Sequence, residues 1–461
     1  MTKTFFLSII RNLWKHRVTS AINILALTLG LSSVLFLYIQ DKYETSFDTH
    51  HAHADRIYRV NITKNYPNRV MKDGNTESML AKALRNEYPE LESVIQVIGP
   101  NNGLVAVNPG TEQEKIFEER INLFYADSSF LKHFDYDLLA GDRRRALDTR
   151  NAIVLSKKIA NKYYPEFEGR ESDLNGKEIE LADSLQVFIT GIVDRPPSNS
   201  NFPFQLLVSS EIYYKMNDWD RDNWNNIASG LTFVVLKEGQ DPAYYEKQFP
   251  AMVAKYQSEE EAEISFYNLL NLKLLHDADE WGFAGNYTNS PAVTIGFISV
   301  GLFILLSACI NFINIQTAQV VTRSKEVGVR KVLGGTRLQL IIQFMAETIF
   351  LTTISFLMAL WITELALQGW NGMLSIIRMD LQFDQSVIVF GIGLILVVSF
   401  ISGIYPALKL SSFDPSESLR SGFSALTGKM DGLYLRQILV VTQFIITQIL
   451  IFGTIVIANQ M

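Results

Sequence analysis

Cysteine is almost absent from this sequence of 461 residues, which has only Cys309. Because a single cysteine cannot pair within its own chain, any part of the protein outside a cell must be held together by its core alone. Cys309 also lies within a long apolar run, where a free cysteine behaves as a small packed hydrophobic residue. We therefore interpret it as a packing residue rather than as a redox site.

A nucleotide-binding motif is also missing. In the pattern G-x-x-x-x-G-K-[ST], backbone N–H groups and the lysine hold the phosphates. The Gly176-Lys177 and Gly428-Lys429 pairs are followed by Glu and Met and have no glycine at the required upstream position, and Gly334-Gly335-Thr336 lacks the lysine. We expect no nucleotide or other cofactor to bind this chain.

The chain also lacks a surplus of basic residues, since its formal net charge is −7. Residues 41–291 hold 27 Lys and Arg against 40 Asp and Glu, a balance of −13, and the remaining residues balance at +6. Nucleic-acid recognition requires a basic patch, so we exclude a nucleic-acid partner. Neither a Ser, His and Asp set nor paired carboxylates occur at spacings that single out hydrolysis, so we do not expect an enzyme.

Charge is nearly absent from five long stretches. A membrane-spanning helix needs ~20 predominantly apolar residues. The stretches that meet this requirement are residues 18–39, 292–321, 338–363, 386–408 and 437–458. The first is longer than the apolar core of a signal peptide, which has about 7–15 residues, so we predict an uncleaved anchor.

The distribution of basic residues predicts the orientation. Basic residues are frequent in 1–17, 322–337 and 409–436, whereas 364–385 has only Arg378. The positive-inside rule therefore places the N-terminus in the cytoplasm, as an amphipathic lead-in on the membrane surface, together with the other two basic segments. Segments 364–385 and 41–291 are then outside.

The large outer segment alternates between strand and helix patterns. Strands are predicted at 56–63, 94–98, 153–155, 178–181, 187–193 and 231–236, and helices at 76–88, 156–164 and 241–257. The predicted fold class is an α-helical membrane protein with a large α+β extracytoplasmic domain, residues 41–291, inserted between the first and second membrane helices. Within this domain, two outer pieces come together around a β-rich insertion at about 110–200.

Three histidines, His50, His51 and His53, follow the first membrane stretch. They could contribute to a metal site, but one loop tripeptide does not supply tetrahedral geometry. We predict a solvated loop.

Residues 322–337 predict a short amphipathic helix lying along the membrane surface. Val329, Val332 and Leu333 share one helical face, and Arg323, Glu326 and Arg330 share another. Glu326 precedes Arg330 by four residues, the favourable order for an exposed ion pair. Gly334 and Gly335 break the helix before the next span. An ordinary basic loop is the alternative, but it does not explain the register, the pair or the glycines.

Lys325–Glu347, KEVGVRKVLGGTRLQLIIQFMAE, resembles the coupling region of MacB/FtsX-type permeases, the membrane subunits of ABC mechanotransmission systems. Arg11–Ile39 resembles the first membrane helix of that family, and Gly403–Arg420 resembles the end of its fourth. The resemblance runs from about residue 5 to 461. In Bacteroidetes-type relatives two such halves share one chain, and this sequence resembles an N-terminal half followed by the opening helix of a second repeat, 437–458.

This resemblance implies a permease subunit in a bacterial inner membrane, with a MacB-like periplasmic core domain whose porter-like part is split by the β-rich subdomain. A separate cytoplasmic ABC ATPase, which binds ATP and Mg, would press on the coupling helix and drive efflux or extraction of an extracytoplasmic substrate. The coupling residues would be Arg323, Glu326, Val327, Gly328, Val329, Arg330, Lys331, Leu333, Gly334 and Gly335. Further partners would be a second permease half or a second copy, and a periplasmic adaptor or hydrolase. The alternatives are an FtsX-like regulator of a cell-wall hydrolase and a membrane-anchored sensor without an ATPase.

Glu347 is the only charged residue within the five membrane stretches. A carboxylate inside a span is costly and usually functional. Glu347 follows Arg337 by ten residues and so lies near the cytoplasmic interface, where the cost is smaller. The family often has Glu at this position, so we expect a structural partner in helix packing rather than a proton relay.

Overall fold

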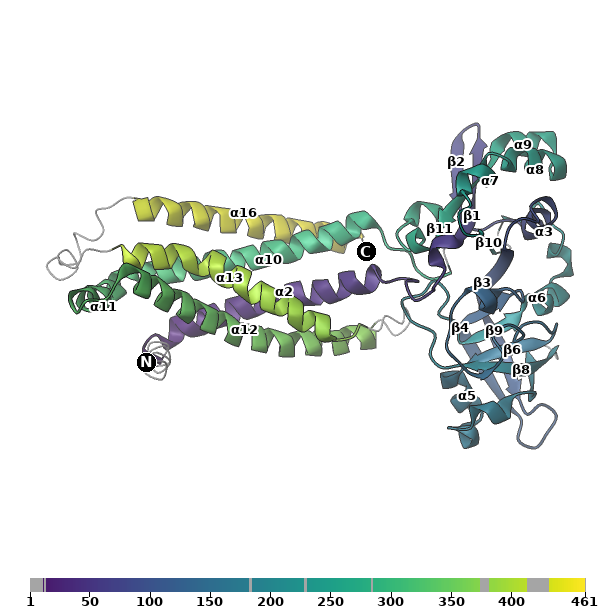
Figure 1. The fold of residues 1–461 in the computed structure, drawn as a ribbon, viewed down its shortest axis with the longest axis horizontal. Coiled ribbons are helices and arrows are strands. Elements are labelled where there is room, and N and C mark those ends of the chain that lie inside the picture. The colour runs from purple at the N-terminus through teal and green to yellow at the C-terminus, as the bar shows by residue number, and fades with distance from the viewer. Residues whose placement is uncertain are drawn as a thin grey trace. The chain divides into compact units, whose positions relative to one another are not determined.

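The structure is a computed structural model that describes residues 11, 14–181, 185–227, 230–282, 285–373, 381–412 and 431–460. The chain divides into two compact units (Figure 1). The helical unit comprises Met1–Lys42 and Ala292–Met461, and the β domain comprises Tyr43–Pro291. Most of the predicted lead-in 1–17 and of the predicted linker 409–436 lies outside the described residues.

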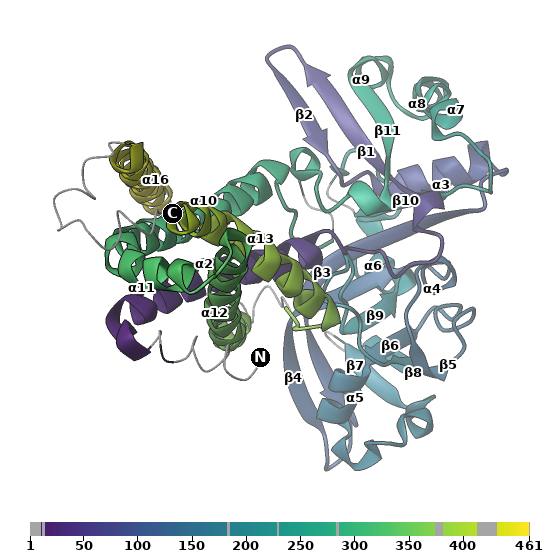
Figure 2. The same cartoon turned by 60° about the vertical axis from the view of Figure 1, so that its left-hand side comes forward.

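The β domain is built on an 11-stranded sheet with the order β11-β1-β10-β3-β4-β9-β6-β8-β5, to which β2 is added at β1 and β7 at β3 and β8 (Figure 2). The strands are β1 (Ile57–Tyr66), β2 (Arg69–Asp73), β3 (Ser93–Val107), β4 (Lys115–Ala126), β5 (Leu138–Gly141), β6 (Ala152–Ser156), β7 (Glu178–Leu181), β8 (Leu185–Val193), β9 (Leu206–Ser209), β10 (Leu231–Val235) and β11 (Ser265–Asn271). The α-helices between them are α3 (Ser78–Glu87), α4 (Phe130–His133), α5 (Lys157–Tyr163), α6 (Ser210–Met216), α7 (Pro242–Glu246), α8 (Phe249–Tyr256) and α9 (Glu259–Ile264).

Strand β3 links two regions of this sheet. Its first residues pair with β10, and Val105–Val107 pair with β7. The ladder between β3 and β4 is irregular from Ile98 to Gly103, which marks the passage from one region to the other. The β-rich insertion predicted at about 110–200 is therefore part of one continuous sheet.

Aromatic side chains form the centre of the β domain. Phe130, Phe134, Phe202 and Phe233 are fully buried in one cluster. Phe202 meets Phe134 and Phe233 edge to face, with ring centroids 5.5 and 5.6 Å apart. Such pairs add to the free energy of burial, and they stabilise a domain that has no cysteine of its own.

The helical unit contains five helices long and apolar enough to cross a membrane among the described residues. They are α2 (Arg17–Glu44), α10 (Pro291–Ala318), α12 (Arg337–Met373), α13 (Gln385–Ser411) and α16 (Asp431–Gln460). A shorter helix, α11 (Val320–Val332), connects α10 to α12. Each predicted span corresponds to one long helix, but the predicted stretch 292–321 runs past the end of α10 into α11.

The third span is longer than predicted. Helix α12 has 37 residues and ends at Met373, ten residues beyond the predicted stretch 338–363. Much of the predicted outer loop 364–385 is therefore helical. The prediction followed hydropathy alone, and polar residues such as Glu364 and Gln368 shortened the apolar stretch without breaking the helix.

The fourth span contains a proline, and its helix ends three residues beyond the predicted stretch 386–408. Helix α13 continues through Pro406 to Ser411. Proline removes one backbone hydrogen bond from a helix interior. Ala407 and Leu410, just beyond it, are almost fully buried against α11 and α12. The burial of these side chains compensates for the lost bond.

Glycines allow close packing of the membrane helices. A Cβ atom on Gly30 in α2 would lie 3.0 Å from Cβ of Ala308 in α10. A Cβ atom on Gly403 in α13 would lie 2.9 Å from Oγ1 of Thr348 in α12. Small residues at such contacts are typical of helix association in membranes. Cys309, next to Ala308, is buried as a packing residue.

Candidate functional site

The site is a helical hairpin made by α11 and the start of α12. Helix α11 ends at Val332, and Gly334 has a φ of +92°, which favours glycine. The N–H of Gly335 donates to the carbonyl of Arg330 at 2.9 Å, and that of Gly334 donates to the carbonyl of Lys331 at 3.0 Å. This is the Schellman arrangement, which stops a helix and reverses the chain. The predicted glycine break is confirmed, and the helix begins two residues before the predicted segment 322–337 and ends five residues before the end of that segment.

One face of α11 packs against the membrane helices. Val327 is 1% exposed and contacts a cluster made of Leu340, Phe344, Ala407 and Leu410. Gly328, next to Val327, is also buried. Helix α11 is therefore held by contacts with α12 and α13 in addition to its covalent connections.

Arg330 connects α11 to α12 at the hairpin end. It donates to Oε1 of Gln343 in α12 at 2.7 Å and to Oε1 of Glu326 in its own helix at 2.7 Å. The predicted Glu326–Arg330 pair is thus confirmed. Glu326 is about half exposed, and exposed pairs of this spacing stabilise a helix by only about 0.3–0.5 kcal/mol.

The opposite face of α11 is apolar and exposed. Val329, Val332 and Leu333 are 49%, 64% and 81% exposed. The predicted sharing of one face by these residues is confirmed. That face points away from the helical unit, although the apolar stripe of an amphipathic helix usually packs against a core.

A hollow lies beside this exposed face. Its volume is about 350 Å³, and it is lined by Arg330, Leu333, Gly334, Gly335, Gln339, Leu340 and Gln343. The lining comes from both arms of the hairpin, so the hollow exists only while α11 and α12 keep their present register. It offers amide groups and one guanidinium beside apolar side chains.

Glu347 has a buried partner in α11. Nη1 of Arg323 donates to Oε2 of Glu347 at 2.9 Å, and both side chains are less than a tenth exposed. The guanidinium also lies 6.0 Å from the ring centroid of Phe344. The sequence grouped Arg323 with Glu326 and Arg330, because helical spacing shows only which residues share a face. It does not show that Arg323 is buried against a partner 24 residues away. A lone carboxylate in a span, which requires a nearby cation, was the available signal.

A second buried charged group, around Asp48, lies in the β domain. The sequence predicted that His50, His51 and His53 lie in a solvated loop, and this prediction is wrong for His51, which is buried. Asp48 and His51 are 0% and 3% exposed. Asp48 accepts hydrogen bonds from Oγ of Ser200 at 2.7 Å and from the backbone and amide N–H groups of Asn201. Burial acts to raise the pKa of the Asp48 carboxyl, but hydrogen bonds from His51 and Ser200 outweigh it and hold the pKa below its usual value.

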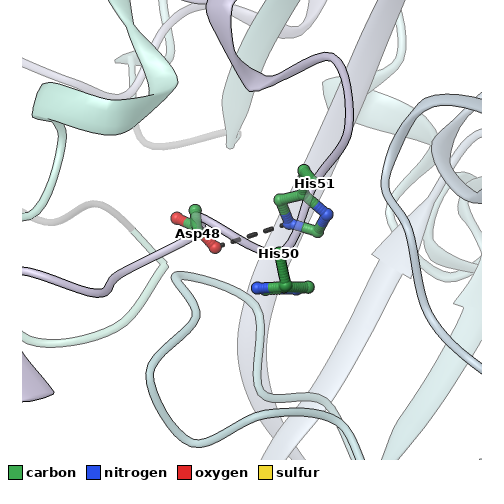
Figure 3. A group of neighbouring side chains, drawn as sticks. All are labelled: Asp48, His50 and His51. Atoms are coloured by element: carbon green, nitrogen blue, oxygen red, sulfur yellow. Dashed lines mark ion pairs between the residues drawn. The ribbon is translucent and has the colours of Figure 1, made fainter. Parts of the chain in front are cut away.

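The ligand atoms of Asp48, His50 and His51 lie within 4.8 Å of one another, which suggests a metal site (Figure 3). However, Nδ1 of His51 accepts a hydrogen bond from the N–H of Asp135 at 2.9 Å. The proton of the neutral ring is then on Nε2, which faces Oδ1 of Asp48 at 3.5 Å and cannot also bind a metal. The group does not fit a metal; it fastens the chain after α2 to the loop containing Ser200.

Comparisons with known proteins cover both units. Residues 20–252 match the model of the MacB-like periplasmic core domain, and residues 298–415 match the FtsX-like permease C-terminal model.

ABC transporter permeases and export ATP-binding/permease proteins are among the relatives. The uncharacterised ABC transporter permease YknZ of Bacillus subtilis is 24% identical over 74% of this chain and 73% of its own length. The pyoverdine export ATP-binding/permease protein PvdT of Pseudomonas syringae pv. syringae is 23% identical over 89% of this chain, which spans only 58% of PvdT. The macrolide export ATP-binding/permease protein MacB of Bdellovibrio bacteriovorus is 29% identical over 29% of this chain and 20% of its own length.

Solved structures that match part of the chain include two periplasmic or permease domains. A domain of a putative permease protein from Porphyromonas gingivalis has a TM-score of 0.40 and 20% identity, covering 48% of this chain and 91% of that one. The periplasmic region of MacB from Actinobacillus actinomycetemcomitans has a TM-score of 0.32 and 12% identity, covering 47% and 90%.

Proposed function

The chain belongs to the family of ABC transporter permeases with MacB-like and FtsX-like domains, and on that premise we propose that it is a non-catalytic subunit that transmits force. A separate cytoplasmic ATPase, which binds ATP and Mg, moves α11, and the membrane helices pass this motion to the β domain. The output is efflux or extraction of a substrate on the far side of the membrane.

The exposed apolar face of α11 carries this proposal. Three neighbouring apolar side chains, Val329, Val332 and Leu333, lie on a helix that is otherwise anchored to α12 and α13. The adjoining hollow can accept a side chain from a partner, with Arg330 at its edge. A surface that is apolar, exposed and backed by a packed helix is suited to receive a partner and to transmit its displacement.

The proposed setting is the inner membrane of a bacterium, with the N-terminus and α11 in the cytoplasm and the β domain outside. Helix α16 supports a further partner within the membrane. Its apolar segment is 6% buried, against 28–44% for the other four membrane helices. A second permease half or a second copy of this chain would cover it.

The test is the double variant V332D/L333D in the full-length chain, co-expressed with a MacB-type ATPase and reconstituted in lipid nanodiscs. We expect ATPase binding to weaken roughly tenfold or more, as for the loss of central apolar contacts in an interface. The matched control is Ile116→Asp, because Ile116 is apolar and 66% exposed but lies in the β domain. Unchanged ATPase binding and ATP turnover in V332D/L333D would contradict the proposal.

A further inference from the structure

The exposed face of helix α11 carries Val329, Val332 and Leu333, whereas Arg323 and Arg330 lie beside Val327 on the face toward the bundle. A helix has about 3.6 residues per turn, so Arg323, Val327 and Arg330 share one face and Val332 lies on the opposite one. Arg323 and Arg330 both reach side chains of α12. Apolar contacts alone would favour the opposite rotation, in which Val329 and its neighbours meet the bundle.

The buried Arg323–Glu347 pair opposes that rotation. Among the described residues, Nε of Arg323 is buried without a hydrogen-bond partner, so the guanidinium is only partly hydrogen-bonded. A buried ion pair of this kind contributes little net stability compared with apolar residues of similar size, but its geometry can specify register. Arg330 and Gln343 form a second, partly exposed contact nearer the hairpin turn.

We propose that Arg323 and Glu347 are positioning residues that set the rotation of α11 and keep Val329, Val332 and Leu333 on its outer face. What docks there rests on the proposed function, whereas the rotation is a property of this chain alone. Without the pair, α11 turns about its axis, its apolar residues move toward the bundle and the docking face is lost.

The test uses cysteine labelling of the full-length chain in nanodiscs, with no ATPase present. Cys309 is the only cysteine, so C309A supplies a background in which V332C reports the outer face and V327C the inner face. In this background a water-soluble maleimide should label V332C quickly and V327C slowly. On adding E347Q, which preserves the side-chain shape, labelling of V332C should fall roughly tenfold and that of V327C should rise, because one partner of a buried pair is lost.

The charge-swapped double variant R323E/E347R restores the pair with its polarity reversed, so it should return both labelling rates toward their starting values. The matched control is Glu326→Gln, which removes an exposed partner of Arg330 and should leave both rates unchanged. Size-exclusion chromatography checks that each variant is folded. If E347Q does not fold, R323E/E347R decides the question, because the proposal requires it to fold and to label as the starting protein does.

Unchanged labelling in folded E347Q, or failure of R323E/E347R to restore the rates, would overturn the proposed role of the pair. The outcome is separable from that of the proposed function. If rotation depends on the pair but no ATPase binds, only the proposed function fails. If the ATPase binds and labelling ignores the pair, only the positioning role fails.

Discussion

The two units of this protein bury charge in different ways. In the β domain, the carboxylate of Asp48 accepts bonds from Ser200 and Asn201 and faces His51. In the helical unit, Arg323 donates to Glu347 in a buried pair between two helices, beside an exposed apolar surface. A carboxylate that accepts several hydrogen bonds from one loop serves to fasten that loop. A single ion pair between two helices, next to a surface that the fold leaves uncovered, points to a role in positioning.

The largest expected effect comes from removing the Asp48 carboxylate in the β domain. Asp48→Ala leaves the donors of Ser200 and Asn201 buried without an acceptor and places alanine at a φ of +53°. We expect the free energy of unfolding of the β domain to fall by about 3–5 kcal/mol. Chemical unfolding of the full-length chain, followed by tryptophan fluorescence, measures the change. Asp48→Asn should lose less unfolding free energy, because asparagine tolerates positive φ. A loss below about 1 kcal/mol in Asp48→Ala would show that Asp48 does not fasten the structure.

A smaller effect is expected from the packing of the helical unit. Gly403→Ala brings a Cβ atom within 2.9 Å of Oγ1 of Thr348, which forces α13 away from α12 and should destabilise the unit by about 1–3 kcal/mol. Thermal unfolding in detergent measures it. Gly393→Ala is the matched control, since a Cβ atom there meets nothing within 4 Å. Equal melting temperatures for the two variants would mean that α12 and α13 do not pack through Gly403.

The smallest effect is a pH dependence confined to the β domain. Burial lowers the pKa of His50 from 6.5 to about 4. Between these values the unfolded chain binds a proton on His50 that the folded chain does not, so stability falls as the pH decreases from 6.5 to 4. His50→Gln should flatten this part of a plot of melting temperature against pH. The lowered pKa of Asp48 adds a further loss of stability only below its ordinary value of 3.8. If the slope of melting temperature against pH above 3.8 is unchanged in His50→Gln, the pH dependence does not come from His50.

Much of the architecture follows from patterns within short segments. The five membrane helices follow from apolar stretches, and the end of α11 follows from two glycines. The Glu326–Arg330 pair follows from helical spacing. These features depend on neighbouring residues, so a single sequence carries them.

The remaining features depend on contacts between distant residues. Helix α13 passes through Pro406 because residues beyond it pack against α11. The outward face of α11 depends on a glutamate 24 residues after Arg323. The fastening at Asp48 depends on Ser200, 152 residues away. Such pairings are not visible in any local pattern. The sequence therefore predicted which residues belong to the candidate site, but not which of them are buried and which are exposed.

The central claim, that the outer face of α11 receives an ATPase, is tested most directly by protection from labelling. The L333C thiol, in a C309A background, would be labelled with a water-soluble maleimide in the presence and absence of a bound MacB-type ATPase. The account predicts that the ATPase slows labelling of L333C and leaves that of I116C in the β domain unchanged. If an ATPase complex forms and L333C is labelled at the same rate as in the free protein, the account is contradicted.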